Sequence, residues 1–490
     1  MLFFDAIPTT VDIQTIVLFF LVLLLSLRLL KSNKLPPGPR GWPIIGSIPH
    51  IDKESYLTFD KWAKEYGDIY TVKLGWSTAV MISSYDAIKS TLKDQGDKFA
   101  DRPLLPIVEL GITIPGSLVF DNGQAWNDRR RWTNGVLRNF GLGKKSLESR
   151  INIEADYLCQ EIDKNSGSFN PLHCVNNAVS NIICSISFGD RFEYSDPEFK
   201  ELLEGLGYLH TRTTFVAPVN AIPLLFYTPM YSRYRDVVTF MKAFIKDIIH
   251  QHHETFDSGD IRDVIDAYIA ESEKEHFDPG LFSEGLLWRI VLDLFGAGTE
   301  TTTTTILWMI LYLVNYPDVQ NKLQQEIDEI LGQEKRPAWD DRHSMPYLEA
   351  TIMEVQRLSN VIPITLRSTT EDIEINGYKI PSGFTIFVNL WSVHHDPDHW
   401  ERPFNFEPER FLMDDLKTFR KKQAFIPFGT GRRGCIGELL ARMELFLFTA
   451  NLIQRFTFKV PDGKPTPSLN ECVPGLTRSP KPYEIYVIKR

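Results

Sequence analysis

The sequence predicts a mainly α-helical protein with small antiparallel β-sheets, preceded by a single transmembrane helix. Three observations predict this fold class. The stretch VDIQTIVLFFLVLLLSLRLL at positions 11–30 is apolar over about 20 residues, the length of a bilayer span. Helical periodicity dominates the rest of the chain, and only a few short segments have the alternation and turn signals of strands.

The charges around the apolar stretch favour a retained membrane anchor. Residues 1–15 contain no Lys or Arg, whereas Arg28, Lys31, Lys34 and Arg40 lie at or beyond its C-terminal end. The positive-inside rule therefore places everything after this helix in the cytosol. A cleaved signal peptide is the alternative, but its basic flank should precede the apolar run.

A proline-rich connector follows the anchor. LPPGPRGWP, residues 35–43, contains four prolines and predicts a stiff, extended spacer. No later segment has the composition of a linker. We therefore expect a lumenal N-terminus at 1–10, a transmembrane signal-anchor helix at 11–30, a basic and proline-rich linker at 31–43, and one catalytic domain at 44–490.

Strands are expected early and late in the folded part. Asn376-Gly377 lies between two alternating segments and predicts a hairpin. The strand-like segments are IYTVKL (69–74), TAVMIS (78–83), DIEINGYKI (372–380) and GFTIFVNL (383–390). Amphipathic helices are expected at 234–254, 318–331 and 346–358.

The segment at 286–314 predicts a long helix through the core, because apolar residues occur on all sides of it. Arg289, Asp293 and Glu300 argue against a second membrane span. Its middle contains two glycines and five consecutive threonines from Thr301, which are poor helix formers. Either the threonine hydroxyls open the helix locally and act with Glu300 in proton delivery, or they bond back to the preceding turn and only kink the helix.

Composition excludes several functions. The net charge of −10 over 490 residues argues against a general nucleic-acid binder. The five cysteines are widely spaced and odd in number, so a reducing compartment is expected rather than a disulfide framework. No CxxCH occurs, which excludes covalent c-type haem.

The loop FGTGRRGCIGE, residues 428–438, fits two kinds of site. Its three glycines before the cysteine form G-x-G-x-x-G, the dinucleotide-binding pattern. Such a turn should follow a buried strand and be answered by an acidic residue about 20 positions on. Pro427 interrupts the preceding segment, and residues 449–458 contain no acid. Nucleotide binding is therefore disfavoured.

Cys435 is the other chemical feature of this loop. A phosphatase loop is excluded because the next arginine, Arg442, comes one position too late. Neighbouring cations and a helix start favour the thiolate. A thiolate suits a transition metal, and haem iron bound by Cys is the arrangement that favours O–O cleavage.

The pattern F-x-x-G-x-R-x-C-x-G, here Phe428, Gly431, Arg433, Cys435 and Gly437, resembles the haem-binding signature of the cytochrome P450 superfamily. The resemblance covers essentially the whole chain and is greatest to the animal microsomal branch, which handles drugs, fatty acids and steroids. It implies the cytochrome P450 fold, haem b with Cys435 as the axial ligand of its iron, O2 as co-substrate, and monooxygenase activity.

The resemblance also implies roles for individual residues. AGTETT at 297–302 matches the oxygen-activation stretch of the family, so Glu300 and Thr301 are expected to deliver protons. The residues expected to bind the cofactor are Cys435, Arg433, Trp126, Arg130, Arg102, Arg367, Phe428, Gly437 and Ala297.

Two further motifs are expected to be structural. Glu354 and Arg357 of EVQR match the E-x-x-R pair of the family, with Arg410 as the third member of a buried network. His395 and His399 have the spacing of zinc ligands, but HDPxxW matches a structural turn of the family. No metal other than haem iron is expected.

Electrons must come from a partner, because no motif for flavin or NADPH is present. The resemblance implies NADPH-cytochrome P450 reductase as the electron donor, with cytochrome b5 as a further candidate. It also implies that the chain is a single-pass protein of the endoplasmic reticulum membrane. Two basic clusters are expected on the cysteine side of the haem, where they would dock an acidic partner; solvated surface charge is the plainer alternative. They are Arg129, Arg130, Arg131, Arg138, Lys144 and Lys145, and Arg420, Lys421, Lys422, Arg432 and Arg442.

A lipophilic substrate (a xenobiotic, fatty acid or steroid) is expected, because the candidate pocket residues are apolar. They are Ile107, Val108, Ile112, Ile114, Leu294, Ala297, Ile362, Ile364 and Leu476. The segment VAPVNAIPLLFY, 216–227, could enter the membrane and admit such ligands, or pack in the core. Two alternatives to a monooxygenase are a haem-thiolate isomerase or dehydratase that uses no O2, and a non-catalytic haem sensor or ligand carrier.

Overall fold

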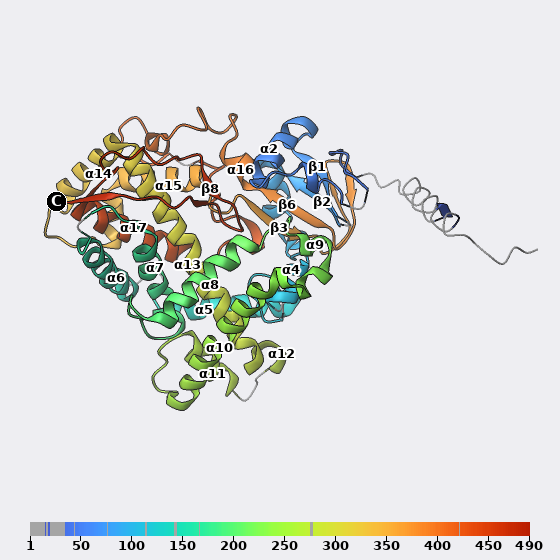
Figure 1. Ribbon diagram of the computed structural model, residues 1–490, viewed down its shortest axis with the longest axis horizontal. Coiled ribbons are helices and arrows are strands. Elements are labelled where there is room, and N and C mark those ends of the chain that lie inside the picture. Colours follow the sequence, from blue (N-terminus) through green and yellow to red (C-terminus); the bar gives the residue numbers. More distant parts are fainter. Residues whose placement is uncertain are drawn as a thin grey trace, which may run out of the picture.

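The computed structural model describes Thr15, Leu18, Phe19 and residues 35–490, apart from positions 44, 76, 113, 114, 142–144, 166, 275–277 and 421. Helices α6, α7, α13, α14, α15 and α17 gather on one side of Figure 1, and the largest β-sheet lies with helix α2 on the other side. Helices α10, α11 and α12 form the lower edge of this view.

Helices make up most of the described chain. The α-helices are α2 (Ser55–Tyr66), α3 (Tyr85–Ile88), α4 (Pro106–Gly111), α5 (Gly123–Asn139), α6 (Lys145–Asp163), α7 (Leu172–Ser187), α8 (Pro197–Arg212), α9 (Pro218–Ala221), α10 (Ser232–Thr255), α11 (Val264–Ser272), α12 (Pro279–Phe282), α13 (Glu284–Asn315), α14 (Pro317–Ile330), α15 (Pro346–Ser359), α16 (Leu390–His394) and α17 (Glu438–Arg455). Among the short 3₁₀ segments, η4 (Pro223–Tyr227), η5 (Pro229–Tyr231) and η8 (Gly431–Arg433) matter below.

Within the described residues, the strands form four small sheets. They are β1 (Ile69–Leu74), β2 (Ser77–Ile82), β3 (Ile364–Ser368), β4 (Ile373–Ile375), β5 (Tyr378–Ile380), β6 (Thr385–Asn389), β7 (Phe456–Lys459), β8 (Cys472–Val473), β9 (Ser479–Pro480) and β10 (Tyr486–Lys489). The prediction of a mainly helical fold with small sheets is confirmed. The sheets are not all antiparallel, because β2 pairs in parallel with β6.

The largest sheet has the strand order β1-β2-β6-β3. Antiparallel pairing places Ile69 opposite Ile82 in β1 and β2, and Arg367 opposite Ile386 in β3 and β6. Phe59 and Trp62 of α2 pack with buried residues of this sheet in a separate apolar cluster. The sheet therefore fixes the position of β3, which carries residues of the candidate site.

Helix α13 runs through the core as the sequence predicts. Two of the charged residues that interrupt its apolar sequence, Arg289 and Asp293, form a buried ion pair with 2.6 Å between nitrogen and oxygen. The glycines serve close helix packing: a Cβ at Gly298 would lie 3.0 Å from Ile183 of α7, and one at Gly296 would lie 3.3 Å from Leu206 of α8.

The other predicted elements also form. The helices expected at 234–254, 318–331 and 346–358 correspond to α10, α14 and α15. The hairpin is present as β4 and β5, with Asn376 at φ 49° and Gly377 at φ 82° in its turn. Both residues tolerate this left-handed backbone, which a two-residue hairpin requires.

The segment at 216–227 connects α8 to α10 through α9 and η4. It divides its side chains between two environments. Val219 and Phe226 are buried in the core, whereas Ile222, Leu224 and Tyr227 are 55%, 76% and 67% exposed. Core packing therefore accounts for only part of this apolar segment.

Among the residues that the structure describes, no helix has both the length and the apolar character needed to cross a membrane. The predicted anchor at 11–30 lies outside the description except for Thr15, Leu18 and Phe19, so it remains a prediction.

Candidate active site

The cysteine loop is held by its backbone in a tight turn before α17. The Cys435 N–H donates to the Phe428 carbonyl at 3.0 Å. Gly431 has φ 75°, and a Cβ at this position would overlap the carbonyl oxygen of Leu92. Only glycine satisfies both constraints. The Ile426 N–H donates to His394 Nε2 at 3.1 Å and anchors the start of the loop.

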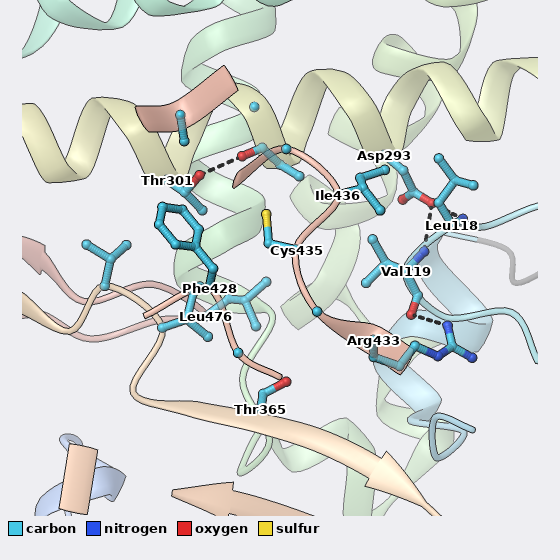
Figure 2. A pocket seen from close by; sticks show the side chains of 18 of the residues that line it. Leu118, Val119, Asp293, Thr301, Thr365, Phe428, Arg433, Cys435, Ile436 and Leu476 are labelled. Carbon is cyan, nitrogen blue, oxygen red and sulfur yellow. Dashed lines mark hydrogen bonds between the residues drawn. The ribbon is translucent and has the colours of Figure 1, made fainter. Parts of the chain in front are cut away.

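A cavity of about 370 Å³ lies between this loop and α13. The sulfur of Cys435 points toward the part of α13 that carries Thr301, and Phe428 and Leu476 lie beside it (Figure 2). The side chain of Cys435 has accessible surface, but that surface faces the cavity that Cys435 lines. The loop therefore presents its sulfur to this cavity.

The expectation that the protein itself favours the Cys435 thiolate is wrong. Burial raises the pKa of the Cys435 thiol, and the Gly437 N–H and Arg130 lower it too little to compensate. Glu438 adds to the increase in this pKa. A coordinated metal cation deprotonates a thiol outright, so the ligand role depends on the metal rather than on the local cations.

Helix α13 forms one wall of the cavity without any break. Thr301 Oγ1 donates to the Ala297 carbonyl at 2.8 Å, and Thr305 Oγ1 donates to the Thr301 carbonyl at 2.8 Å. All residues from Glu284 to Asn315 remain α-helical. The predicted local opening of the helix is therefore wrong, because these hydroxyls bond back to the preceding turn while the helix continues. Ala297 and Thr301 both line the cavity.

Glu300 does not line the cavity with Thr301. Its Oε1 accepts hydrogen bonds from Thr477 Oγ1 at 3.1 Å and Ser479 Oγ at 3.4 Å, in the C-terminal segment around β9. Adjacent residues on a helix point about 100° apart, so one faces the cavity and the other does not. The expected carboxylate–hydroxyl pair is thus split, and Glu300 instead fixes the residue next to Leu476.

Four arginines converge on the cavity, and none has an ion pair among the described residues. Arg102 Nη1 and Arg367 Nη1 both donate to the Leu366 carbonyl, at 2.5 Å and 2.6 Å. Arg130 donates to the Gly434 carbonyl. Arg433 Nη2 donates to the Asp121 carbonyl at 2.6 Å. All four line the cavity.

Burial lowers the pKa values of these arginines, and the neighbouring cations lower three of them further. Burial, with Arg130 nearby, lowers the pKa of Arg102 to about 10. Burial, with Arg102 nearby, lowers the pKa of Arg433 to about 8 and holds the pKa of Arg367 well below its usual range. Buried charges of one sign need counter-charge. The donor set therefore fits a ligand that carries carboxylates.

Trp126 was expected to bind the cofactor, but it lies behind the arginines rather than on the cavity wall. Its indole N–H donates to the Leu118 carbonyl at 2.9 Å. The guanidinium carbon of Arg433 lies 3.4 Å from the centre of the indole rings, which places the cation over the ring. The structure thus gives Trp126 the function of supporting Arg433.

Glu354, Arg357 and Arg410 come together in a buried ion triad. Arg357 Nε and Nη2 donate to the two oxygens of Glu354 at 2.8 Å each, and Arg410 Nε donates to Oε1 at 2.9 Å. Arg357 also donates to the His394 carbonyl at 2.8 Å. Because His394 anchors the segment before Phe428, the triad connects α15 to the cysteine loop.

The two histidines with the spacing of zinc ligands make structural contacts, as the match to a structural turn predicts. His395 stacks on Trp391, with 3.8 Å between ring centres, and its Nδ1 bonds to the Trp391 carbonyl at 2.9 Å. Burial holds the pKa of His395 well below its usual range. His399 packs edge-on against Tyr85.

The lining of the cavity includes most of the predicted substrate residues. Val108, Leu294, Ala297, Ile362, Ile364 and Leu476 line it. Ile107 and Ile112 do not: Ile107 is fully buried in the core, and Ile112 packs against it. Ile114 lies outside the described residues.

Several lining residues were not predicted from the sequence. They are Leu105, Val119, Phe120, Asp293, Thr213, Thr214, Phe215, Gln356, Asn360 and Glu444. Asp293 Oδ2 accepts from Ser117 Oγ and from the Leu118 N–H, both at 2.7 Å, and so holds the loop before α5 against α13 (Figure 2). Its position one residue before Leu294 was the available signal.

The basic clusters are only partly at the surface. Arg129 is buried and bonds to Asp121, and Arg130 lines the cavity. Arg131 and Arg432 are exposed but pair with Asp128 at 3.2 Å and Asp97 at 2.5 Å. Lys144 and Lys421 lie outside the described residues. Arg138 and Lys145 are exposed.

Comparison with known proteins decides between the candidate classes. Residues 36–487 match the family described as Cytochrome P450. The chain belongs to the cytochrome P450 family. It is 40% identical over 495 residues to cytochrome P450 2D6 of Homo sapiens, covering 98% of this chain and 99% of that protein. It is 37% identical over 494 residues to cytochrome P450 2U1 of Mus musculus, covering 95% and 92%.

Membership in this family makes the chain a cytochrome P450 monooxygenase, an oxidoreductase that uses haem and O2. The residues present fit that cofactor: the sulfur of Cys435 faces the cavity opposite α13, and four arginines that form no ion pair within the described part of the chain could bind its two propionates. The G-x-G-x-x-G of the loop is accordingly part of a thiolate loop and not of a nucleotide site.

Proposed function

We propose that this cytochrome P450 inserts one atom of O2 into a neutral lipophilic substrate, with electrons from NADPH delivered by a flavoprotein reductase. The observation that carries the proposal is the set of apolar side chains that line the same cavity as Cys435 and Thr301. Haem, when bound, supplies the activation of O2.

The residues of the cavity divide the remaining work. Cys435 Sγ would hold the iron, while Arg102, Arg130, Arg367 and Arg433 would hold the two propionates. Phe428, Gly437 and Ala297 line the same cavity and would lie against the cofactor. Thr301 Oγ1 donates to the Ala297 carbonyl, and its lone pairs can accept a hydrogen bond. Glu300 would instead position the segment that contains Leu476, through its bonds to Thr477 and Ser479.

The preference for a neutral substrate follows from the engagement of Asp293. One of its oxygens pairs with Arg289 at 2.6 Å, and the other accepts from Ser117 and Leu118. An amine substrate would have to compete with these partners for the carboxylate. Most of the other lining side chains on α13 are apolar or bear hydroxyl groups.

The first experiment uses the full chain with reductase and NADPH in phospholipid vesicles, supplied with candidate lipophilic substrates. We expect product with one oxygen from ¹⁸O2, and a red-shifted Soret band for the reduced carbon monoxide complex that Cys435→Ser abolishes. Product without oxygen uptake would indicate an isomerase or dehydratase. Haem binding without turnover on any substrate would indicate a sensor or carrier.

Reductase docking is proposed on the exposed basic residues of α5 and α6. Arg138 and Lys145 are exposed on neighbouring elements. Reversing both charges should raise the apparent KM for reductase several-fold, with the effect diminishing at high salt. The exposed Lys200 on α8 provides the control, as Lys200→Glu changes charge on a different helix. An equal effect of both variants would argue against a specific docking site.

The proposed location is the endoplasmic reticulum membrane, with the catalytic domain in the cytosol. Leu224, Tyr227 and Met230 are 76%, 67% and 66% exposed, and a lipid surface would cover them. A fluorophore at Leu224→Cys should be quenched by brominated lipid, whereas one at Lys200→Cys should not. Protease protection of an N-terminal but not a C-terminal tag in microsomes tests the single-pass orientation.

A further inference from the structure

Glu444 on α17 differs from every other buried acid in the described part of the chain. Six Asp or Glu side chains are buried there: Glu154, Asp263, Asp266, Asp293, Glu354 and Glu444. The first five each have an Arg or His nitrogen at 2.6–2.8 Å. Glu444 has no such partner, and its Oε1 accepts no hydrogen bond.

An unpaired carboxylate in such a place takes up a proton. Burial of the side chain raises the pKa of Glu444 to about 8, and the hydroxyl of Thr302 is the one neighbour that lowers it. At pH 7 the group is therefore mostly a neutral carboxylic acid. In that form it has an O–H donor as well as an acceptor oxygen.

The position of this acid connects it to the proposed reaction. Glu444 lines the same cavity as Cys435, Thr301 and Thr302. Thr302, the neighbour that lowers the pKa of Glu444, directly follows Thr301 on α13. Stability alone does not account for a glutamate at position 444. An apolar side chain of similar volume would fill the same space without the cost of a buried oxygen that has no hydrogen bond.

We propose that Glu444 is a proton-relay residue, whose carboxyl O–H passes a proton through the Thr302 hydroxyl and bound water to Thr301. The O–H bond of Glu444 breaks, a carboxylate remains, and a proton from solvent water restores the acid. No electron passes through the residue. The relay rests on the proposed function, because a monooxygenase that reduces O2 consumes protons in each turnover.

The deciding variant is Glu444→Gln, which keeps the shape and loses the transferable proton. With reductase, NADPH and substrate, we expect product per NADPH to fall about tenfold or more, with a rise in hydrogen peroxide and a larger solvent deuterium isotope effect. Glu349→Gln is the matched control: the pKa of Glu349 is also raised, with burial as the cause, but Glu349 does not line the cavity. It should behave as the unaltered chain.

Infrared spectroscopy gives a readout that does not depend on turnover. The unaltered chain should show the carbonyl band of a protonated carboxyl that shifts in D2O and titrates near pH 8, and Glu444→Gln should lack it. The same titration on the unaltered chain serves if the variant does not fold. Unchanged coupling in Glu444→Gln, or no titrating band, overturns the relay alone. An unaltered chain that forms no product overturns the proposed function and the relay together.

Discussion

The substitution Glu354→Gln should destabilise the protein far more than a single lost hydrogen bond would. Glu354 is fully buried and accepts bonds from Arg357 and Arg410, as well as from the Glu407 N–H at 3.0 Å. A neutral amide leaves two guanidinium groups without their anion, and one of its amide hydrogens faces a donor. Removing one partner of a buried ion pair costs about 3–5 kcal/mol.

This cost converts to a measurable shift in melting temperature. The unfolding entropy is about 1 kcal/mol per kelvin for a domain of about 450 residues, so we expect Tm to fall by about 3–5 °C. Thermal scans by circular dichroism and urea titration both measure the effect. The loss is a large part of the typical total stability of about 5–15 kcal/mol.

Glu407→Gln is the matched control for this experiment. Glu407 also contacts Arg410, at 3.4 Å, but its side chain is 26% exposed. Solvent screens that pair, and about 0–1 kcal/mol is expected. If Glu354→Gln and Glu407→Gln lower Tm equally, burial of the triad does not determine its contribution, and the reasoning fails.

Three further predictions concern other parts of the structure. Gly431→Ala should prevent haem incorporation, because its Cβ would overlap a carbonyl oxygen. Gly429→Ala, at φ 70° but with nothing within 4 Å of the new Cβ, should lower the free energy of unfolding by only about 1–2 kcal/mol. The absorbance of bound haem and the Tm distinguish the two variants. Thr301→Ala should lower the product formed per NADPH about tenfold or more, with a matching rise in hydrogen peroxide. Thr305→Ala loses the same kind of hydroxyl-to-carbonyl hydrogen bond within the helix but should not have this effect. Equal effects of the two variants would assign the change to helix stability. Burial opposes protonation of His252, but its bond to a buried carboxylate at 2.8 Å outweighs this and raises the pKa of the imidazole. The stability it contributes is therefore full below about pH 6.5 and is lost as pH rises through the raised pKa, so urea midpoints measured across pH 5–9 should flatten in His252→Gln.

Local patterns predicted local structure well. The Asn376-Gly377 turn and the periodicity of α14 depend on neighbouring residues alone, and both elements form where expected. The parallel pairing of β2 with β6 could not be predicted, because it joins segments that are distant in sequence. Nothing in either strand encodes the identity of its partner.

The candidate site shows the same division. Cys435 and the arginines could be named from motifs, and the structure brings them to one cavity. Glu300, Trp126 and Ile107 were assigned to the site but do not line the cavity. The direction in which each side chain points depends on helix rotation and tertiary packing, which a motif does not specify. The pKa of Cys435 was predicted in the wrong direction because the sequence displays nearby cations but not the burial that outweighs them.

The four arginines without acidic partners also bear on how much of this protein a cell can maintain. Burial of these like charges, and the repulsion between them, lowers the free energy of unfolding. A dianionic ligand that binds only the folded form offsets this loss of stability. A shortage of haem should therefore reduce the abundance of this P450 by exposing it to proteolysis, before any effect on its catalytic rate. Supply of the prosthetic group would then set the cellular amount of the protein as well as its activity.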